Sequence, residues 1–161
     1  MKNRSLFLLL ISHLCIGGLG FALGIYYLPI LIAPDGPDDQ AIAEVMNKKL
    51  YFGEFSPDRK DSDRLHWGEG LVSISQESIA FSGELAPGPD YRLYLSPQFV
   101  ETEDEFNRLK VDMLHVGYVK TFESVLVSLP LGIDLSKYNT VIVWCETFGQ
   151  FITSTRYKRR L

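Results

Sequence analysis

Cysteine is scarce in this chain of 161 residues, which contains only Cys15 and Cys145. Cys15 lies in an apolar N-terminal run, so the remainder of the chain has one cysteine and forms no internal disulfide. The sequence also lacks a Cys-x-x-Cys-His motif, which excludes covalent haem attachment of that kind. The scattered histidines and Cys145 do not have the spacing of a zinc finger. The part of the chain that follows the apolar run, about 127 residues, must therefore fold without disulfides, and it is long enough to bury its own apolar core.

Basic residues are also few and dispersed. The chain has 16 Lys and Arg against 20 Asp and Glu, with a formal net charge of −4. Only Lys2 and Arg4 precede residue 34, so the rest of the chain carries a net charge of about −6. Nucleic-acid binding needs a basic stripe that neutralises phosphates, and we predict no such partner. Residues 158–161, which include the one basic cluster, are predicted to be a frayed, solvated tail.

A long apolar run extends from Leu6 to Ile32, interrupted by Ser12 and His13. It exceeds the roughly 20 residues that a helix needs to cross a bilayer. A cleavable signal peptide has a shorter apolar core and small residues at the cut, whereas large side chains occupy residues 28–32. We therefore predict that residues 1–33 form an uncleaved transmembrane signal anchor.

Charge on either side of the anchor predicts its orientation. Lys2 and Arg4 precede the apolar run, and Asp35, Asp38 and Asp39 follow it. Because basic residues flanking a membrane helix stay in the cytoplasm, the N-terminus is predicted to be cytoplasmic. The chain is then a single-pass cell-membrane protein whose C-terminal part lies outside the cytoplasm, in the periplasm or the extracellular space.

The exported part divides into a short helix and one β domain. Residues 38–49 open with acids, close with lysines and place Ile42, Val45 and Met46 on one face, which predicts a juxtamembrane helical stalk over residues 34–50. From residue 51 to 157, apolar residues alternate in short runs separated by turns. Thr102 and Glu105 have capping-box spacing for one short helix. The pattern predicts an all-β sandwich or barrel of about seven to eight strands.

Five motifs occur in a fixed order along this domain: WGEG at residues 67–70, PGPDYRLYLS at 87–96, VGYVKTF at 116–122, YNTV at 138–141 and VWCETF at 143–148. Together they resemble the DM-thirteen domain, also called the Skeletor-type electron-transfer domain, over about residues 51–157. The resemblance implies an extracytoplasmic β-rich module, often tethered to membranes and, in animals, found beside cytochrome-type redox domains. It also implies an electron-transfer role centred on the family's cysteine, which falls at Cys145.

Two interpretations of Cys145 are open. Strand alternation puts Cys145 on one face with Val141 and Val143, at the edge of the predicted core, and Trp144 on the other. In the first interpretation Cys145 is a redox thiol, or a metal or haem ligand, because an unpaired thiol is unusual in an oxidising compartment. In the second it is a small buried hydrophobe, a common fate of free cysteine. No basic residue adjoins it, so the fold must supply any activating charge.

A bound haem would need axial ligands, and the candidates besides Cys145 are His66, His115, Met46 and Met113. Met113 and His115 share a strand face if a strand begins that early. The sequence pattern alone leaves the cofactor unknown. A Cys-His-Asn catalytic set is conceivable from Cys145, a histidine and Asn139, but no motif marks it.

Two functions follow from these patterns. The first is a membrane-tethered extracytoplasmic electron-transfer or thiol-redox module in which Cys145 reacts, with a redox protein as partner. The second is a non-enzymatic adhesion or scaffold domain in which Cys145 is structural. The sequence pattern does not decide whether the protein is an enzyme.

Overall fold

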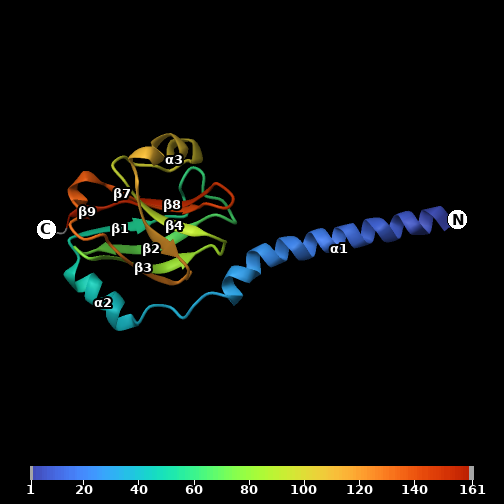
Figure 1. Cartoon of the computed structure of the whole chain (residues 1–161), viewed down its shortest axis with the longest axis horizontal. Coiled ribbons are helices and arrows are strands. Elements are labelled where there is room, and N and C mark those ends of the chain that lie inside the picture. The colour runs from blue at the N-terminus through green and yellow to red at the C-terminus, as the bar shows by residue number, and fades with distance from the viewer. Residues whose placement is uncertain (1, 160–161) are drawn as a thin grey trace.

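Two antiparallel β-sheets face each other in the computed structural model, which describes residues 2–159 (Figure 1). One sheet has the strand order β6-β3-β2-β1-β9 and the other has the order β5-β4-β7-β8. The strands are β1 (Tyr51–Phe55), β2 (Gly68–Ile74), β3 (Ser78–Leu85), β4 (Tyr91–Ser96), β5 (Leu114–Val119), β6 (Ser124–Ser128), β7 (Thr140–Cys145), β8 (Gln150–Arg156) and β9 (Lys158–Arg159). The helices are α1 (Lys2–Leu31), α2 (Asp39–Lys48) and α3 (Glu103–Leu109), with short 3-10 turns η1 (Lys110–Asp112) and η2 (Leu135–Lys137). The predicted all-β sandwich with one short internal helix and a preceding long apolar helix is confirmed.

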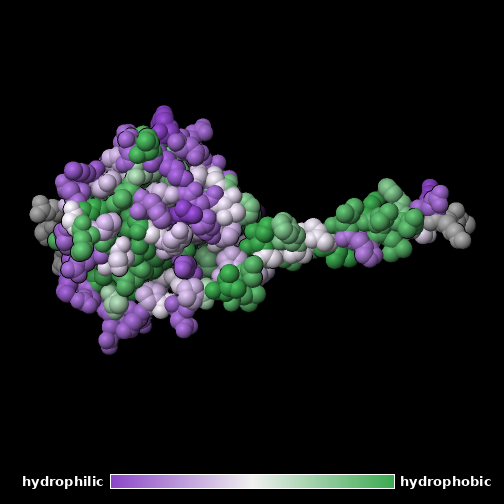
Figure 2. Space-filling model, in the orientation of Figure 1, coloured by the Kyte–Doolittle hydropathy of each residue, from purple (hydrophilic) through white to green (hydrophobic). Residues whose placement is uncertain are grey.

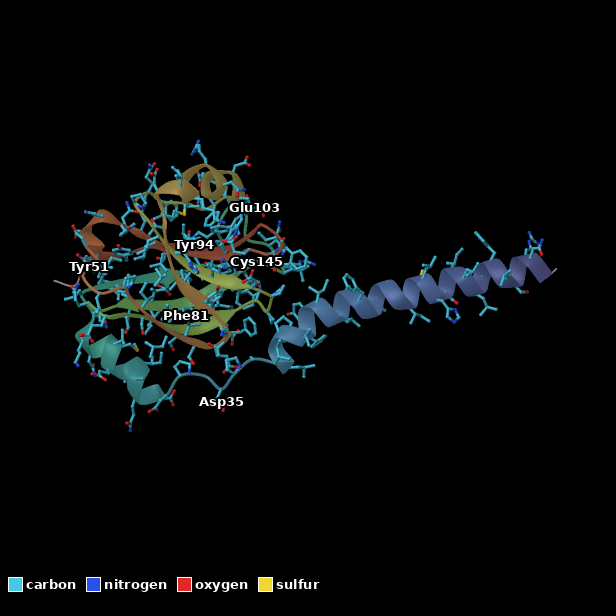
Figure 3. All side chains as sticks on the ribbon, viewed as in Figure 1. Asp35, Tyr51, Phe81, Tyr94, Glu103 and Cys145 are labelled. Carbon is cyan, nitrogen blue, oxygen red and sulfur yellow. The ribbon has the colours of Figure 1, made fainter. Side chains whose placement is uncertain are left out.

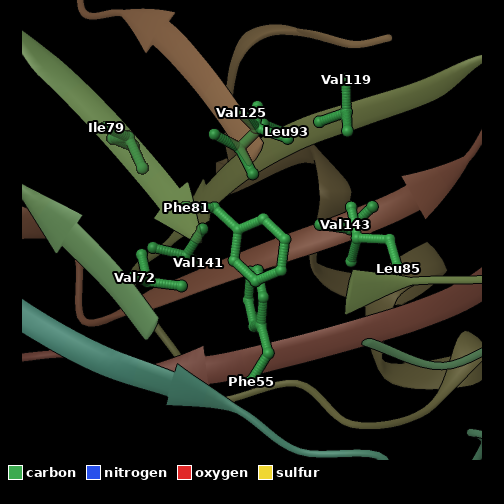
Figure 4. Close-up of a pocket in the computed structure, with 10 residues that line it drawn as sticks. All are labelled: Phe55, Val72, Ile79, Phe81, Leu85, Leu93, Val119, Val125, Val141 and Val143. Carbon is green, nitrogen blue, oxygen red and sulfur yellow. The ribbon is translucent and has the colours of Figure 1, made fainter. Parts of the chain in front are cut away.

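Apolar side chains fill the space between the sheets. In the β2–β3 hairpin, which the alternating pattern predicted, Ile74 pairs with Ile79 and Val72 with Phe81, and all four side chains are buried. They pack against inward-facing residues of β4 and β7 (Figure 4). The cavity left among them measures about 10 Å³, which is at the lower limit for one water molecule. The space between the sheets is therefore packed core and holds no ligand site within the described residues.

Strand β7 is buried on both faces. Val141, Val143 and Cys145 belong to the core between the sheets, as the alternation predicted. Ile142 and Trp144 point the other way, into a second cluster on the outer face of the four-stranded sheet. The strand lies between β4 and β8 and pairs with both. It is thus enclosed by packing on its two faces and by hydrogen bonds on its two edges.

Helix α3 covers the outer face of β7. The predicted capping box forms its start, because the Thr102 hydroxyl accepts a hydrogen bond from the backbone N–H of Glu105 at 3.2 Å. Phe106, which is fully buried, stacks on Trp144 with ring centroids 3.8 Å apart. Its edge also meets the ring of Tyr94 at 5.2 Å. This aromatic cluster fixes the helix on the sheet.

Glu146, the first residue after β7, ties the same region together. Its carboxylate accepts hydrogen bonds from the Lys110 ammonium at 2.8 and 2.9 Å and from the Tyr94 hydroxyl. Burial by itself raises the pKa of Glu146, but the bonds from Lys110 and Tyr94 outweigh it, so the pKa lies below its usual value. Burial and the adjacent carboxylate raise the pKa of Tyr94. Glu146 is therefore an ionised link between η1 and the sheet.

The predicted juxtamembrane helix exists as α2, but it packs on the domain. Asp38 caps it by accepting a hydrogen bond from the backbone N–H of Gln40 at 3.1 Å. Ile42 and Val45 are buried against Ala80 of β3, on the outer face of the five-stranded sheet. The helix thus covers a sheet face (Figure 1), where a free-standing stalk would leave these two side chains exposed.

Helix α1 has 30 residues, which correspond to a length of about 45 Å. It is long and apolar enough to cross a membrane, and none of its most apolar window is buried. Figure 2 shows hydrophobic surface over most of this helix, with a polar patch partway along it. Only its C-terminal part comes close to the sandwich (Figure 1).

The prediction of a frayed tail is wrong for its first two residues. Lys158 and Arg159 form β9 and pair with Phe52 and Tyr51 of β1. Tyr157, just before β9, is also held in place, because its hydroxyl donates a hydrogen bond to the backbone carbonyl of Leu135 at 2.8 Å. Residues 160 and 161 lie outside the described part of the chain.

Removing the ring of Phe106 is expected to destabilise the domain strongly. The change Phe106→Ala leaves a cavity over Trp144 and should lower the free energy of unfolding by about 3–5 kcal/mol. Val111→Ala is the matched control, because Val111 lies nearby in η1 and is 87% exposed, and should change it by less than about 0.5 kcal/mol. Urea unfolding of the full chain in detergent, followed by far-UV circular dichroism, measures both. Equal effects of the two changes would contradict this packing.

Replacing Glu146 with Gln is expected to lower the free energy of unfolding by about 1 kcal/mol at pH 7. The folded-state pKa of Glu146 is depressed, so its stabilisation is present above about pH 4.3 and is lost as the pH falls through the folded-state pKa. Urea unfolding of wild type and E146Q at a series of pH values should show the difference shrinking towards about pH 3. A difference that stays constant over this range would argue against an ionised Glu146 held by Lys110.

Candidate functional site

Cys145 is the last residue of β7 and lies at the end of the sandwich that faces α1 (Figure 3). Its side chain is 2% exposed, and it is a free thiol. The predicted position at the edge of the core, where the strand ends, is the one observed. Cys15, the other cysteine, is exposed on α1 and far from it in sequence.

Backbone groups from two loops surround the sulfur. The thiol donates a hydrogen bond to the carbonyl of Pro89, with 3.1 Å between Sγ and the oxygen. The backbone N–H groups of Phe148 and Thr147, in the turn that follows β7, act on the sulfur and lower the pKa of the thiol. Gly149 closes this turn with φ of +63°, a left-handed conformation that favours glycine. The turn thus supplies two backbone donors that favour negative charge on the sulfur.

Burial raises the pKa of the Cys145 thiol above its usual value. The hydrogen bonds from Phe148 and Thr147 act in the opposite direction, and the negative charges of Asp90 and Glu146 add to the increase. The carboxylate of Glu146 is itself bound by the Lys110 ammonium, 2.8 Å away. The thiol is therefore protonated near neutral pH, and the thiolate does not form unaided.

Tyr91 is the immediate neighbour of Cys145 in the sheet. The two residues pair directly between β4 and β7, and Tyr91 is 2% exposed. Burial raises the pKa of its phenol, and the nearby Cys145 adds to this effect. A side chain at Gly88 would place its Cβ 2.4 Å from the Tyr91 hydroxyl, so only glycine leaves room for the phenol there. The PGPD turn therefore shapes the surroundings of the sulfur.

A cavity of about 350 Å³, here called the cysteine cavity, lies between α1 and this end of the domain. Its walls are mostly apolar, and Cys145, His66, Tyr91 and Tyr26 contribute its few polar groups. A larger apolar cavity of about 560 Å³ adjoins it along α1. Both fall in the size range of sites that bind small molecules. The cysteine cavity is lined by Leu19, Ala22, Leu23, Ile25, Tyr26, Leu65, His66, Pro87, Gly88, Pro89, Tyr91, Cys145 and Phe148.

The candidate haem ligands are dispersed. His66 shares the cysteine cavity with Cys145, and its Nδ1 lies 3.1 Å from the Asp63 carboxylate. His115 lies in β5, an edge strand of the four-stranded sheet, and the centroids of the His115 and Tyr94 rings are 5.2 Å apart. Met113 packs against the outer aromatic cluster, and Met46 belongs to α2 and packs against the cluster that this helix forms with β3. Met113 and His115 thus lie across the sheet from Cys145, and of the candidate ligands only His66 borders the same cavity as Cys145 in the described structure.

Other chemistry considered from the sequence is not assembled either. Among the described residues, no three His, Cys, Asp or Glu side chains gather in a way that would hold a metal ion. Asn139 precedes β7 and Cys145 ends it, so about 20 Å of strand separates them and the Cys-His-Asn set does not form.

Sequence reasoning missed two contributors to the site. The Pro89 carbonyl and Tyr91 come next to Cys145 only through loop packing and strand register. One signal was present, since both belong to the PGPDY motif, but nothing in the motif indicated contact with Cys145.

Comparison with known families agrees with this arrangement. The family model described as electron transfer DM13 matches residues 44–157, which include the end of α2 and all of β1 to β8. No curated protein and no solved structure matches the chain. The matched region contains Cys145, the turn behind it and the PGPDY segment. Because the match covers well over half of its length, the chain belongs to the electron transfer DM13 family.

Proposed function

We propose that this protein is an electron-transfer module tethered to a membrane by α1, with its β domain outside the cytoplasm and Cys145 as its redox group. Family membership supports an electron-transfer role. Helix α1 has the length and composition of a membrane span, and the basic residues before it with the acidic residues after it favour this orientation.

The observation that carries the role of Cys145 is its position on the wall of the cysteine cavity, where the backbone N–H donors of Thr147 and Phe148 lower the pKa of its thiol. Such donors stabilise negative charge on sulfur, whether in a thiolate, a sulfenate or a metal-bound thiolate. A cysteine that served only as a small hydrophobe would gain little from them. The cysteine cavity adds a route by which a small reactant reaches this one atom.

The raised pKa determines what kind of chemistry this is. A protonated, buried thiol resists exchange with passing disulfides, so Cys145 stays reduced in an oxidising compartment. The simplest closed cycle for one thiol uses a peroxide as two-electron acceptor. The thiol and the peroxide give a sulfenic acid and water or an alcohol, and one thiol of a dithiol partner then forms a mixed disulfide and releases water. The second partner thiol displaces Cys145 as a thiol and leaves the partner's disulfide, so two electrons pass from the dithiol to the peroxide.

A second function, a non-enzymatic adhesion or scaffold domain, is favoured by one observation. Cys145 is 2% exposed and its pKa is raised by burial, as for a small core side chain. In that case its replacement would affect packing alone.

The state of the sulfur separates the two functions. In the Cys15→Ser variant Cys145 is the only thiol, and the full chain purified from its own membrane is treated with peroxide and a sulfenic-acid trap. Mass spectrometry of the segment 138–156 is expected to find the trapped adduct in native protein, and a mixed disulfide when a dithiol replaces the trap. The Cys15→Ser, Cys145→Ala protein is the matched control and should give neither. Modification that requires prior unfolding with urea would leave Cys145 as a structural residue.

The buried thiol also predicts how stability depends on pH. The pKa of Cys145 is higher in the folded than in the unfolded chain, so its contribution is fully present below about pH 8.5 and is lost as the pH rises through the folded-state value. Between about pH 8 and 10, the free energy of unfolding of wild type should therefore fall more steeply than that of Cys145→Ser. Urea unfolding at several pH values measures this difference. Parallel curves would show that the thiol is not shielded as described.

A further inference from the structure

We infer that the end of the β domain around the cysteine cavity rests in the outer leaflet of the bilayer that α1 crosses, so that this cavity opens to lipid. The surface concerned, here called the apolar rim, consists of Leu65, Pro87, Pro89, Tyr118 and Phe148. This inference rests on the membrane tether in the proposed function. It adds where the domain sits and from which phase Cys145 is reached.

The level of the rim follows from the length of α1. At 1.5 Å per residue, about 20 residues cross the 30 Å hydrocarbon core, so a span that begins at Leu6 ends near Ile25. Tyr26 and Tyr27 come next, at the boundary where aromatic side chains gather in membrane proteins. Leu19 to Tyr26 border the cysteine cavity, and Leu19 lies about 9 Å below that boundary. The rim residues on the opposite wall therefore lie at the depth of the outer leaflet.

The rim itself has the composition of a surface that enters lipid. Leu65 is 59% exposed, Tyr118 54% and Phe148 51%, and the two prolines beside them are partly exposed. These side chains come from separate loops and one strand, yet all of them line the cavities against α1. Exposed apolar residues gathered at one end of a domain mark an interaction site, whereas scattered ones do not.

Charges near the rim suit the headgroup level. The Arg92 guanidinium lies over the Tyr118 ring at 5.2 Å and the Lys120 ammonium at 5.9 Å from its centroid. Arg92 also pairs with Asp90 at 3.3 Å, so the nearest carboxylate is not left unpaired. Long basic side chains above an apolar surface reach phosphate oxygens while their stems stay in the apolar region. Asp63, at the same end of the domain, has its carboxylate 3.1 Å from Nδ1 of His66.

The opposite end of the sandwich provides a contrast. Leu131 is fully exposed there, in the loop between β6 and η2, but polar residues including Asp134 and Lys137 follow it in this segment. No helix long and apolar enough to cross a membrane borders that end in the described chain. The apolar rim therefore suits contact with lipid, and the end that carries Leu131 suits contact with water.

The position of the rim defines what reaches Cys145. A cavity walled by α1 on one side and by the rim on the other is entered from the acyl region of the outer leaflet. The peroxide that oxidises Cys145 is then one that dissolves in the bilayer, such as a lipid hydroperoxide. A water-soluble oxidant in the aqueous phase does not reach the sulfur directly, because the Cys145 side chain is only 2% exposed.

Spin labels measure the depth of the rim in the intact protein. Full chains reconstituted in phospholipid vesicles carry one nitroxide each, at Phe148→Cys or Leu131→Cys in a Cys15→Ser background, or at the native Cys15. Collision rates with oxygen, which concentrates in the bilayer, and with a water-soluble nickel complex give the depth of each label. The label at position 148 is expected about 5–10 Å inside the phosphate level, and the label at 131 in water. The label at Cys15 should lie near the bilayer centre.

Each other result has a distinct meaning. A deep Cys15 label with a label at position 148 in water would overturn the lipid contact and leave the tether standing. A label at position 148 shielded from both collision partners would show that protein covers the rim, which also overturns the inference. A Cys15 label in water would remove the tether and the lipid contact together. The redox role of Cys145 is tested separately by its trapped sulfenic acid, so its failure is distinguishable from all three.

Discussion

Burial of β7 on both faces is the constraint on which the site depends. Its inner side chains, Val141 and Val143, fill the core, and its outer ones, Ile142 and Trp144, lie under α3. A one-residue slip of the strand would exchange these two sets, so its register is strongly specified. Cys145 at the end of the strand is thereby placed beside its neighbours by a strand that is packed on both faces and paired on both edges. Its position does not depend on a mobile loop.

Two opposed influences then act on the sulfur. Burial and nearby carboxylates disfavour negative charge, while the N–H groups of Thr147 and Phe148 favour it. The first influence dominates at rest, which keeps the thiol protonated and slow to react. The second is already oriented when charge develops on the sulfur during a reaction, so no reorganisation is needed at that moment. The same pocket therefore protects the thiol from unselective chemistry and supports a selected reaction.

The fold was largely predictable, and the surroundings of the site were not. Alternation of apolar residues gave the β2–β3 hairpin and the two faces of β7, because each strand buries a face of period two. The face of α2 that carries Ile42 and Val45 was also recognised, but a periodic pattern does not name the surface that a helix packs on. His66 lies far from Cys145 in sequence, and no local signal encodes the loop packing that unites them. The two-residue β9 likewise exists only through its pairing with β1.

The short connection from α1 to the domain limits how far the site can move from α1. Residues 32–38 join the end of α1 to α2, and seven extended residues reach at most about 25 Å. Their reach is shortened further, because Gly36 passes close to Ser124 at the start of β6 and α2 is packed on the sheet. In an antiparallel sandwich the loops after β3, β5 and β7 emerge at one end, which is the end that faces α1. Topology and linker length together keep the end of the domain that carries Cys145 close to the C-terminal end of α1.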